Sequence, residues 1–368
     1  MTSHTSKTRL SAISSHLDSN KSKTMSKTQS AQQLPWDPNA LSFPSHDELP
    51  SLPDAPEGAA WVWGKDDQLG RLNLLTPERV KASATEIKTG DMVRLDLPLN
   101  VPATPAFGRE VFQHNIKPII PDMGYDDTYV MNTQSSTQWD GFRHFCHVPT
   151  KTFYNGAKSS DFVGDKSNLR CSIHHWAEHG IAGRGVLLDY HHYAHAHSKP
   201  YNPYKAHEIT FSDLQACAQF QGLDIRPESQ GGDIRPGDIL LVRSGFVQEY
   251  HKLNPDQRHA AATRQEAEWA GLSREKPMRD WLHDCYFAAA VGDSPTFEVW
   301  PPPGFGADHV SLHQSMLSLW GCPIGEMWDL ENLAVKCRDL GKWTFFMTSA
   351  PANMPGGVGS HANATAIL

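Results

Sequence analysis

The chain has 368 residues, of which 39% are hydrophobic and 20% are charged, and these proportions are typical of an ordinary globular protein. Its formal net charge of −8 at pH 7 provides no overall basic surface for nucleic acid or for anionic lipid, so we expect neither as a partner. The sequence holds no run of about 18 apolar residues, which excludes a membrane-spanning helix as the expected architecture.

The first 35 residues differ from the rest in composition. They are rich in Ser, Thr and Lys, and they carry five basic residues against one acidic residue. Such a segment has too few apolar side chains to offset the entropy cost of ordering, so we predict a disordered tail. A similar composition occurs in organelle transit peptides, and mitochondrial targeting stays open as an alternative to a cytoplasmic location.

Residues 36–60 are rich in proline and predict an extended arm that lies on the surface of the protein. The folded domain is expected to span residues 61–368. Its first helix should begin after Thr76, a typical N-cap, with Pro77 in the first turn, and continue to Ile87. The alternating run GDMVRLDLPL (90–99) then predicts a strand.

Helices and short strands alternate along the rest of the chain. The apolar runs that predict strands are GRGVLLDY (183–190), RPGDILLVRSGF (235–246), a run ending at Asp293, CPIGEMW (322–328) and KWTFFMTSA (342–350). Helices are predicted at 210–223, where Thr210 or Ser212 caps the first turn, at the start of RDWLHDCYFAAAVGDSP (279–295), and at 308–321, where Gly321 ends the helix. Because neither a repeat nor a linker interrupts this order, the sequence predicts a single α/β domain with a mixed sheet flanked by helices.

Motifs for nucleotides and for two common classes of hydrolase are missing. GxxxxGK[ST] and GxGxxG after a strand do not occur, so we expect no nucleotide cofactor. HExxH and GxSxG are absent as well. The histidines of HHYAHAH (191–197) could chelate a metal by their density alone, but a solvated loop after the strand at 183–190 is the favoured interpretation.

The six cysteines are scattered, with neither a CxxC motif nor the spacing of a disulfide framework. Free thiols are typical of a reducing compartment, so the sequence predicts a cytoplasmic protein.

The segment NTQSSTQWDGFRHFCH (132–147) concentrates the groups suited to chemistry. On a strand, four of its polar side chains would share one face: Gln134, Ser136, Gln138 and Asp140. Such a row is costly inside a buried body unless it lines a site. A following turn could bring His144 over Asp140, and a carboxylate beside an imidazole raises its basicity, as a general base requires. The spacing is equally compatible with a turn cap and an ordinary hydrogen-bonded histidine.

This segment resembles the signature His-x-Gly-Thr-His-x-Asp-x-Pro-x-His of the Putative cyclase family, which includes kynurenine formamidase (arylformamidase) and isatin hydrolase. Three positions match the signature: Thr137, Asp140 and His144. Four positions differ, with Gln134 and Gln138 at the two metal-binding histidines and Ser136 and Phe142 at the glycine and the proline.

Later blocks are similar to the family's blocks in the same order: GRGVLLD (183–189), RPGDILLVRSGF (235–246), VGDSP (291–295) and GGVGSHANA (356–364). HQSML and GCPIGEMWDL carry the family's further histidine and glutamate over to His313 and Glu326. The resemblance covers roughly residues 61–368. WGKDDQLGRLNLLTPE together with NTQSSTQWDG is similar to a fungal-type branch, in which glutamine is usual at the second position.

The resemblance implies a swivelling β/β/α fold, a homodimer or higher homo-oligomer, and a hydrolase that opens an amide, lactam or ester of an aromatic small molecule, as arylformamidase does in tryptophan catabolism. It implies one divalent metal, Mn²⁺ or Zn²⁺, and a catalytic histidine at His144. The metal ligands carried over are Asp140, His313 and Glu326, helped by Gln138. Because an amide oxygen is a weaker ligand than imidazole and suits harder ions, the glutamines predict reduced metal affinity.

Two other functions stay open. His144 and Asp140 could do acid–base work without a metal while the glutamines bind a carbonyl, in an isomerase, cyclase or dehydratase of secondary metabolism. The other open function is that of a binding protein or an inactive relative. The retention of both carboxylates (Asp140 and Glu326) and both histidines (His144 and His313) argues against it. Four tryptophans near these blocks suit an aromatic substrate face, although core positions are the commoner role for such residues: Trp139, Trp300, Trp320 and Trp328.

Overall fold

The computed structural model describes residues 30, 32–301 and 310–368. Most of the expected N-terminal tail lies outside this part of the chain. The proline-rich segment that follows has little regular structure beyond the 3₁₀ helix η1 (His46–Glu48). Its first aromatic ring, Trp36, is only 3% exposed and packs in a small apolar cluster with Val62, Leu74 and Tyr286. The core therefore begins to receive side chains well before Trp61.

A mixed sheet of nine strands forms the centre of the described body, in the order β1-β13-β11-β5-β7-β9-β10-β4-β12. Its strands are β1 (Met92–Arg94), β4 (Gln138–Asp140), β5 (Ile181–Leu188), β7 (Ile239–Val242), β9 (Ala289–Gly292), β10 (Ile324–Glu326), β11 (Thr344–Ser349), β12 (Gly359–His361) and β13 (Ala364–Ile367). The neighbours β5, β7, β9 and β10 run parallel, and the other pairs are antiparallel. The mixed sheet confirms the α/β class.

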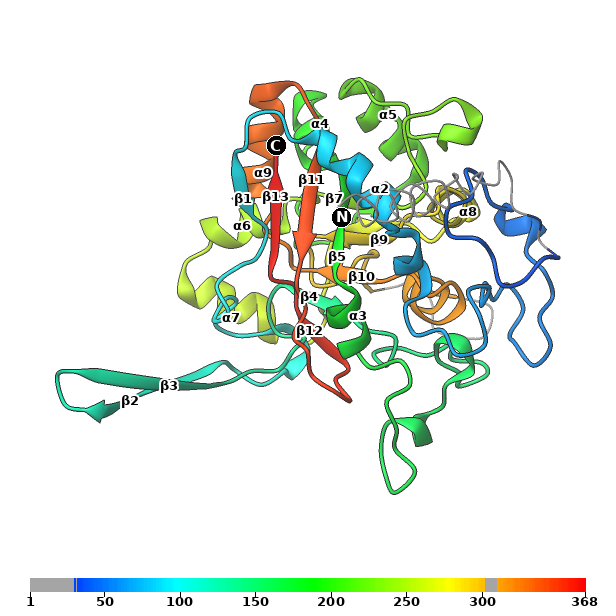
Figure 1. Cartoon of the computed structure of the whole chain (residues 1–368). Coiled ribbons are helices and arrows are strands. Elements are labelled where there is room, and N and C mark those ends of the chain that lie inside the picture. Colours follow the sequence, from blue (N-terminus) through cyan, green and yellow to red (C-terminus); the bar gives the residue numbers. More distant parts are fainter. Residues whose placement is uncertain (1–29, 31, 302–309) are drawn as a thin grey trace, which may run out of the picture.

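Helices surround this sheet (Figure 1). They are α2 (Pro77–Ser83), α3 (His174–His179), α4 (Tyr190–Ala196), α5 (Phe211–Phe220), α6 (Phe246–Lys252), α7 (Pro255–Thr263), α8 (Lys276–Asp284) and α9 (Glu331–Leu340). Short helical turns join them: η2 (Gly70–Leu74), η3 (Ala84–Glu86), η4 (Ala106–Gly108), η5 (Tyr154–Gly156), η6 (Ser159–Asp161), η7 (Glu228–Gln230) and the π-helical turn η8 (Gln314–Leu319). The described residues include no helix that is long and apolar enough to cross a membrane.

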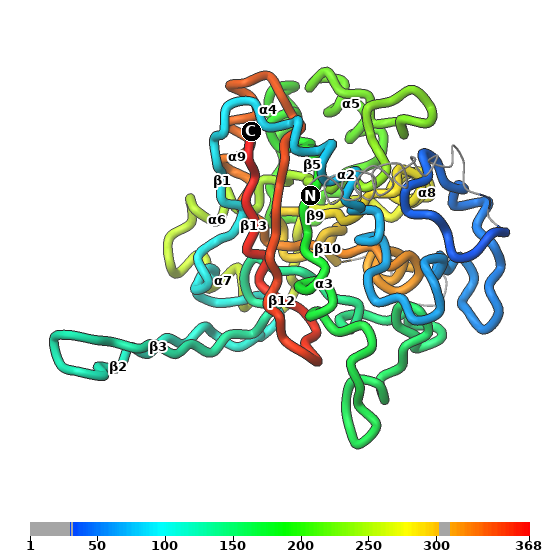
Figure 2. The backbone as a smooth tube through the Cα atoms, viewed as in Figure 1, coloured from blue at the N-terminus to red at the C-terminus, as the bar shows by residue number. Residues whose placement is uncertain are grey.

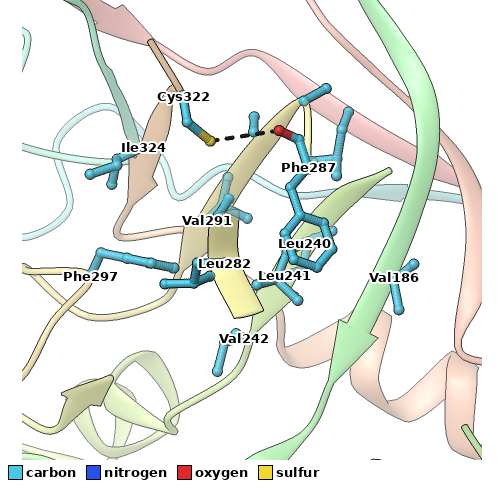
Figure 3. Close-up of a cluster of buried hydrophobic side chains, with 14 of the residues drawn as sticks. Val186, Leu240, Leu241, Val242, Leu282, Phe287, Val291, Phe297, Cys322 and Ile324 are labelled. Carbon is cyan, nitrogen blue, oxygen red and sulfur yellow. Dashed lines mark hydrogen bonds between the residues drawn. The ribbon is translucent and has the colours of Figure 1, made fainter. Parts of the chain in front are cut away.

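The main core lies on the parallel strands. Every residue of β7 and β9 is buried, as expected for parallel strands that are covered on both faces. Figure 3 shows the side chains of Leu240, Leu241 and Val291 around the ring of Phe287, and all four belong to the main buried cluster. The backbone carbonyl oxygen of Phe287 accepts a long hydrogen bond (3.7 Å) from the Cys322 thiol. All six cysteines are free thiols.

Several predicted elements are confirmed at their capping residues. The Thr76 hydroxyl accepts a hydrogen bond from the backbone N–H of Arg79 (3.4 Å) at the start of α2. Thr210, rather than Ser212, caps α5 through a capping box with Asp213. The strands predicted at 183–190 and 235–246 appear as β5 and β7.

Three predictions need correction. The strand expected at 90–99 is reduced to the three residues of β1. The helix expected at 308–321 is present at 312–319 in the described part of the chain, but Gln314–Leu319 form the π-helical turn η8 and not a regular α-helix. HHYAHAH is not a solvated loop, because most of it forms α4, which begins at the cap Asp189 and buries His191 to 6% exposure.

Two further pairs of strands were not predicted. The short strands β6 (Glu208–Ile209) and β8 (Gly271–Leu272) pair in parallel beside the main sheet. The longer strands β2 (Gln113–Ile120) and β3 (Gly124–Val130) form an antiparallel hairpin that extends away from the body (Figures 1 and 2). Proline at 118 and at 121 interrupts the sequence pattern of this hairpin, which explains why it was missed.

Candidate active site

Two paired strands and the start of η8 bring the predicted site residues together. In β4 and β10, which run antiparallel, Gln138 lies opposite Glu326 and Asp140 lies opposite Ile324. His313 is the residue just before η8. Because residues two apart on a strand face the same side, Gln138 and Asp140 point together toward Glu326 and His313.

The predicted row of four polar side chains on one strand is wrong, because β4 contains only Gln138–Asp140. Ser136 lies in the preceding turn, where its hydroxyl donates to the carbonyl oxygen of Val101 (2.6 Å) and not to the site. Gln134 lies in the same turn but does reach the site through its amide oxygen.

Three carboxylates converge on the imidazole of His313. Its Nε2 lies 3.1 Å from Glu326 Oε1 and 3.4 Å from Asp140 Oδ2. Its Nδ1 lies 2.8 Å from Glu298 Oε1, and the Glu298 carboxylate also accepts the backbone N–H groups of Leu312 and His313. All three carboxylates are buried. This is a strong local excess of negative charge around one ring.

The crowded charges shift the pKa values of the cluster. Burial lowers the pKa of His313, but its contacts with the carboxylates of Asp140, Glu298 and Glu326 outweigh burial, so the pKa is raised well above its ordinary value. Burial, reinforced by the neighbouring Asp140 charge, raises the pKa of Glu326 to about 7. Burial also acts to raise the pKa of Asp140, yet the His144 and His313 charges lower it further than burial raises it. The His313 imidazolium therefore offsets part of the negative charge of the acids.

Two buried oxygen atoms of the site lack a well-aligned hydrogen-bond donor: Asp140 Oδ2 and Gln138 Oε1. Asp140 Oδ2 has only charge contacts, with His313 Nε2 (3.4 Å) and with His144 Nε2 (4.0 Å). The Gln138 amide nitrogen donates to Glu326 Oε2 (2.8 Å) and to Gln134 Oε1 (3.1 Å), and these two bonds fix which way its oxygen points. An unsatisfied buried acceptor costs about 1–3 kcal/mol. Such acceptors indicate a place for a cation or for donor groups of a substrate.

Gln134 orients the side chain of Gln138 and is itself fixed at both ends of its amide. Its amide oxygen accepts from Gln138, and its amide nitrogen donates to the carbonyl oxygen of Trp139 (3.3 Å). Gly359 on β12 leaves room for this side chain, because a Cβ atom there would lie 2.3 Å from Gln134 Nε2 and 2.7 Å from the Trp139 carbonyl oxygen. With both ends of its amide engaged, Gln134 is not a free ligand.

His144 stands at the open side of the cluster, and its side chain is 21% exposed. The predicted turn is present, since the His144 N–H donates to the carbonyl oxygen of Gly141 (2.8 Å). Its Nε2 lies 4.0 Å from Asp140 Oδ2, which is longer than a hydrogen bond. Burial lowers the pKa of His144 more than the Asp140 charge raises it, so the ring is neutral at pH 7.

These residues fit a divalent cation. Ligand atoms of Asp140, His313 and Glu326 lie within 4.8 Å of one another. The Gln138 amide turns its nitrogen to the Glu326 and Asp140 carboxylates (2.8 and 3.5 Å), so its oxygen would become a further donor only after the amide turns over. Two carboxylates with one imidazole suit a hard ion such as Mn²⁺ better than Zn²⁺. Glu298 on the far nitrogen of His313 matches the carboxylate partner that usually orients a metal-binding histidine.

Two residues of the site, Glu298 and Arg109, were not predicted from the sequence. Glu298 belongs to no motif, and folding alone brings it to His313, 15 positions later. Arg109 Nη1 donates to the carbonyl oxygen of Gln134 (2.5 Å), and its charge acts to lower the pKa values of Asp140, His144 and Glu326.

Three of the four tryptophans near the predicted site are core residues, as is commoner for such positions, and not part of a substrate face. Trp139, Trp320 and Trp328 are at most 1% exposed. Aromatic side chains do line a narrow cleft of about 30 Å³ next to Gln134 and Arg109, and these are Tyr204, Phe246, Tyr250 and Trp269. A cleft of this size admits about one water molecule, so a substrate ring would contact its mouth.

Comparisons with known proteins agree with this fold. A family model described as "Putative cyclase" matches residues 41–299. No curated protein matches the chain. A solved structure described as a novel cyclase is 28% identical, with 84% of this chain and 99% of that chain covered and a TM-score of 0.71. An isatin hydrolase bound to the product analogue thioisatinate is 14% identical, with 80% and 97% covered and a TM-score of 0.51, which shows the same fold. The chain belongs to the cyclase family that this model describes.

Proposed function

We propose that the chain is a hydrolase that opens an amide, lactam or ester of an aromatic small molecule at the Asp140–His313–Glu326 cluster. The observation that carries the proposal is the excess of buried acceptor atoms around His313. Gln138 Oε1 has no donor, Asp140 Oδ2 has only charge contacts with imidazoles, and Glu298 holds the other nitrogen of the His313 ring. A buried acceptor without a well-aligned donor is uncommon in a purely structural cluster.

A divalent cation, Mn²⁺ in preference to Zn²⁺, would be held by Asp140, His313 and Glu326, with the oxygen of Gln138 as a further donor once its amide has turned over. When bound, such an ion supplies Lewis-acid polarisation of a substrate carbonyl. The Glu298 carboxylate accepts a hydrogen bond from His313 Nδ1, so Nε2, which faces Asp140 and Glu326, is the ring nitrogen that would hold an ion. Holding an ion there would require the ring to give up its Nε2 proton.

The proton chemistry belongs to His144. Its neutral, partly exposed ring takes a proton from the attacking water and returns it to the leaving nitrogen or oxygen. The charge of Asp140, 4.0 Å from Nε2, stabilises the imidazolium formed between these two steps. The aromatic mouth of the cleft beside Gln134 suits a flat aromatic group on the substrate.

The substrate class draws support from the solved isatin hydrolase that shares this fold, and isatin contains a lactam. An arylformamidase of tryptophan catabolism, acting on N-formylkynurenine, is the second substrate hypothesis within the same chemistry.

One observation favours a different reaction. The pKa of Glu326 is raised to about 7 beside the imidazolium of His313. Near neutral pH, Glu326 can therefore both donate and accept a proton without the help of a metal. With His144 as the second group, such a pair suits metal-free isomerisation, cyclisation or dehydration.

The test is turnover of isatin and of N-formylkynurenine by protein dialysed against chelator and then reloaded with Mn²⁺ or Zn²⁺. We expect ring opening or deformylation that depends on the ion and is lost in Asp140→Asn. A matched control is Asp126→Asn, at an exposed aspartate of the hairpin. Turnover that survives removal of the ion would favour the metal-free reaction, and ion binding without either turnover would reject both substrates.

A further inference from the structure

Metal-ligating side chains also gather outside the active site. Besides the active-site cluster, the described residues bring together two groups of three such side chains: His174, His175 and Glu178 on α3, and His46, Asp47 and Asp280. In the second of these groups the ammonium of Lys276 already lies 3.0 Å from Asp47 and 2.7 Å from Asp280, so a cation of the chain itself takes the place of an ion. The group on α3 is therefore the stronger one.

The spacing along α3 places three ligands on one helical turn. Glu178 follows His175 by three positions and His174 by four, and residues at these spacings are neighbours on the surface of a helix. The two imidazole rings pack together, with their centroids 3.9 Å apart. Ligand atoms of the three side chains lie within 4.8 Å of one another. Ligands of a tetrahedral Zn²⁺ at about 2.1 Å lie roughly 3.4 Å apart, so a small rotation of the exposed Glu178 side chain closes the site.

Each imidazole of this group has one nitrogen engaged and one free. The His175 Nε2 lies 3.0 Å from the carbonyl oxygen of Leu169. A carbonyl oxygen only accepts, so this nitrogen carries the proton and Nδ1 of His175 keeps a lone pair. The His174 Nδ1 lies 2.7 Å from the Ser172 hydroxyl, which leaves Nε2 of His174 without a hydrogen bond to any described residue. Partners of this kind on the far nitrogen orient the histidines of metal sites.

Glu178 supplies the negative charge of the group. Its side chain is exposed, and in the described part of the chain no lysine or arginine forms an ion pair with it. The group thus offers two imidazoles and one carboxylate, whereas the active-site cluster offers one imidazole and two carboxylates around the ion. Imidazole-rich sites suit Zn²⁺, and carboxylate-rich sites suit Mn²⁺. The choice of ion therefore separates the two sites.

The start of α3 is fastened to the turn that carries His144. The Ser172 hydroxyl that contacts His174 also accepts a hydrogen bond from the backbone N–H of Gly356 (2.8 Å). The carbonyl oxygen of Gly356 accepts in turn from Arg143 Nη1 (2.9 Å), and Arg143 is the residue before His144. An ion that fixes the His174 ring therefore also restrains a chain of contacts that ends at the active site.

We propose that His174, His175 and Glu178 form a Zn²⁺ site separate from the active-site cluster, and that its ion braces the start of α3 against the turn of His144. Three protein ligands leave the fourth position of the ion to water. An ion that binds only the folded chain stabilises it. This site goes beyond the proposed hydrolase reaction and does not depend on which substrate is turned over.

The first test is Zn²⁺ binding by the full chain without an affinity tag, in the Asp140→Asn background, which disables the active-site cluster. Calorimetric titration and elemental analysis after dialysis should give close to one Zn²⁺ per chain, and the ion should raise the melting temperature. Adding His175→Gln or Glu178→Gln should weaken binding about tenfold or more, because each removes one of three ligands. Both residues lie at the surface, so circular dichroism should show an intact fold.

The matched control is His195→Gln in the same background, at an exposed histidine of the histidine-rich α4. It should bind Zn²⁺ as tightly as Asp140→Asn alone, and Mn²⁺ should bind all of these proteins far more weakly than Zn²⁺ does. Asp140→Asn protein that binds no Zn²⁺ overturns the proposal. Binding that is indifferent to His175 and Glu178, or that is lost in His195→Gln, also overturns it and indicates an adventitious ion. Mn²⁺ binding by wild type, which tests the active-site cluster, is a separate measurement.

Hydrogen exchange tests the brace itself. In Asp140→Asn, one equivalent of Zn²⁺ should slow amide exchange several-fold in residues 171–180 and also in residues 141–147 and 354–358. Adding Glu178→Gln should abolish the change in all three segments. Slower exchange in residues 171–180 alone would show that the ion is held by α3 but does not restrain the turn of His144.

Discussion

Two clusters of buried charge lie in the same domain and differ in how completely their atoms are paired. In the first, Arg243 donates to Asp189 Oδ1 (2.7 Å) and with two nitrogens to Glu331 (2.9 and 2.6 Å). The second oxygen of Asp189 accepts from Arg338 (2.6 Å). In the second cluster, three carboxylates surround His313, and Asp140 Oδ2 lacks a well-aligned hydrogen-bond donor.

The difference separates a structural role from a functional one. The matched charges around Arg243 raise the pKa of its guanidinium despite burial, so this network holds β5, β7 and α9 together in one protonation state. The cluster around His313 instead keeps an excess of acid, and burial together with the Asp140 charge raises the pKa of Glu326 to about 7. Buried groups with such perturbed pKa values are typical of sites that bind or react.

The largest expected effect is on turnover in His144→Ala. Loss of a general base costs about 10²–10⁴-fold in rate. The fold should be intact by circular dichroism, because the ring is partly exposed and donates no short hydrogen bond to Asp140. His195→Ala, at an exposed histidine on α4, is the matched control and should retain full turnover. Unchanged turnover in His144→Ala would remove this residue from the mechanism.

The comparison of the two clusters predicts unequal losses in the free energy of unfolding when one charged residue of each is replaced. Arg243→Ala leaves Asp189 and Glu331 without their shared partner and should lower the free energy of unfolding by about 3–5 kcal/mol. Glu326→Gln removes a carboxylate whose raised pKa makes its ionised form unfavourable, so at pH 8 the loss should stay within about 1 kcal/mol. Urea denaturation of both variants measures this. Equal losses would erase the distinction between the clusters.

Glu298 sharpens the comparison, because it acts on the reaction only through His313. Glu298→Gln should weaken Mn²⁺ binding and lower turnover about 10–100-fold, as is usual for the carboxylate partner of a metal-binding histidine. Excess Mn²⁺ should restore part of this turnover, whereas no concentration of the ion should restore His144→Ala. A loss in Glu298→Gln that the ion cannot relieve would point to a general structural defect instead.

The smallest expected effect concerns pH. Burial, reinforced by the Arg243 charge, lowers the pKa of His191 to about 3 in the folded chain. Between pH 6.5 and 3 the unfolded chain binds this proton and the folded chain does not, so stability falls as the pH falls through that window. Between pH 7 and pH 5, the free energy of unfolding should fall by about 1 kcal/mol less in His191→Gln than in wild type, after allowance for partial solvent screening. Parallel stability curves for the two proteins from pH 7 to 5 would contradict the assignment.

The parts of the fold that the sequence predicts are those decided by local rules. The apolar runs at 183–190 and 235–246 become β5 and β7 because parallel strands are covered on both faces. Thr76 and Thr210 cap their helices through contacts three residues away. The same rules misjudged HHYAHAH, because its polarity conceals the packing of His191 against Gly245, where a Cβ atom would lie 2.2 Å from the ring.

The candidate site was predicted as a set of residues but not as a geometry. Asp140, His144, His313 and Glu326 do meet, and the resemblance to the cyclase family was needed to connect the last two with the first. Gln134 was expected to share a strand face with Gln138, yet it lies outside β4 and supports Gln138 from the turn. Glu298 could not be found, because no local pattern links it to His313.

The most direct test is the amount of divalent metal that the folded chain retains. Elemental analysis of purified protein, after loading with Mn²⁺ and extensive dialysis, should give close to one ion per chain in wild type and almost none in Asp140→Asn. The same ion should raise the melting temperature of wild type only. Folded wild-type protein that retains no ion and still turns over substrate would contradict a cation site at Asp140, His313 and Glu326.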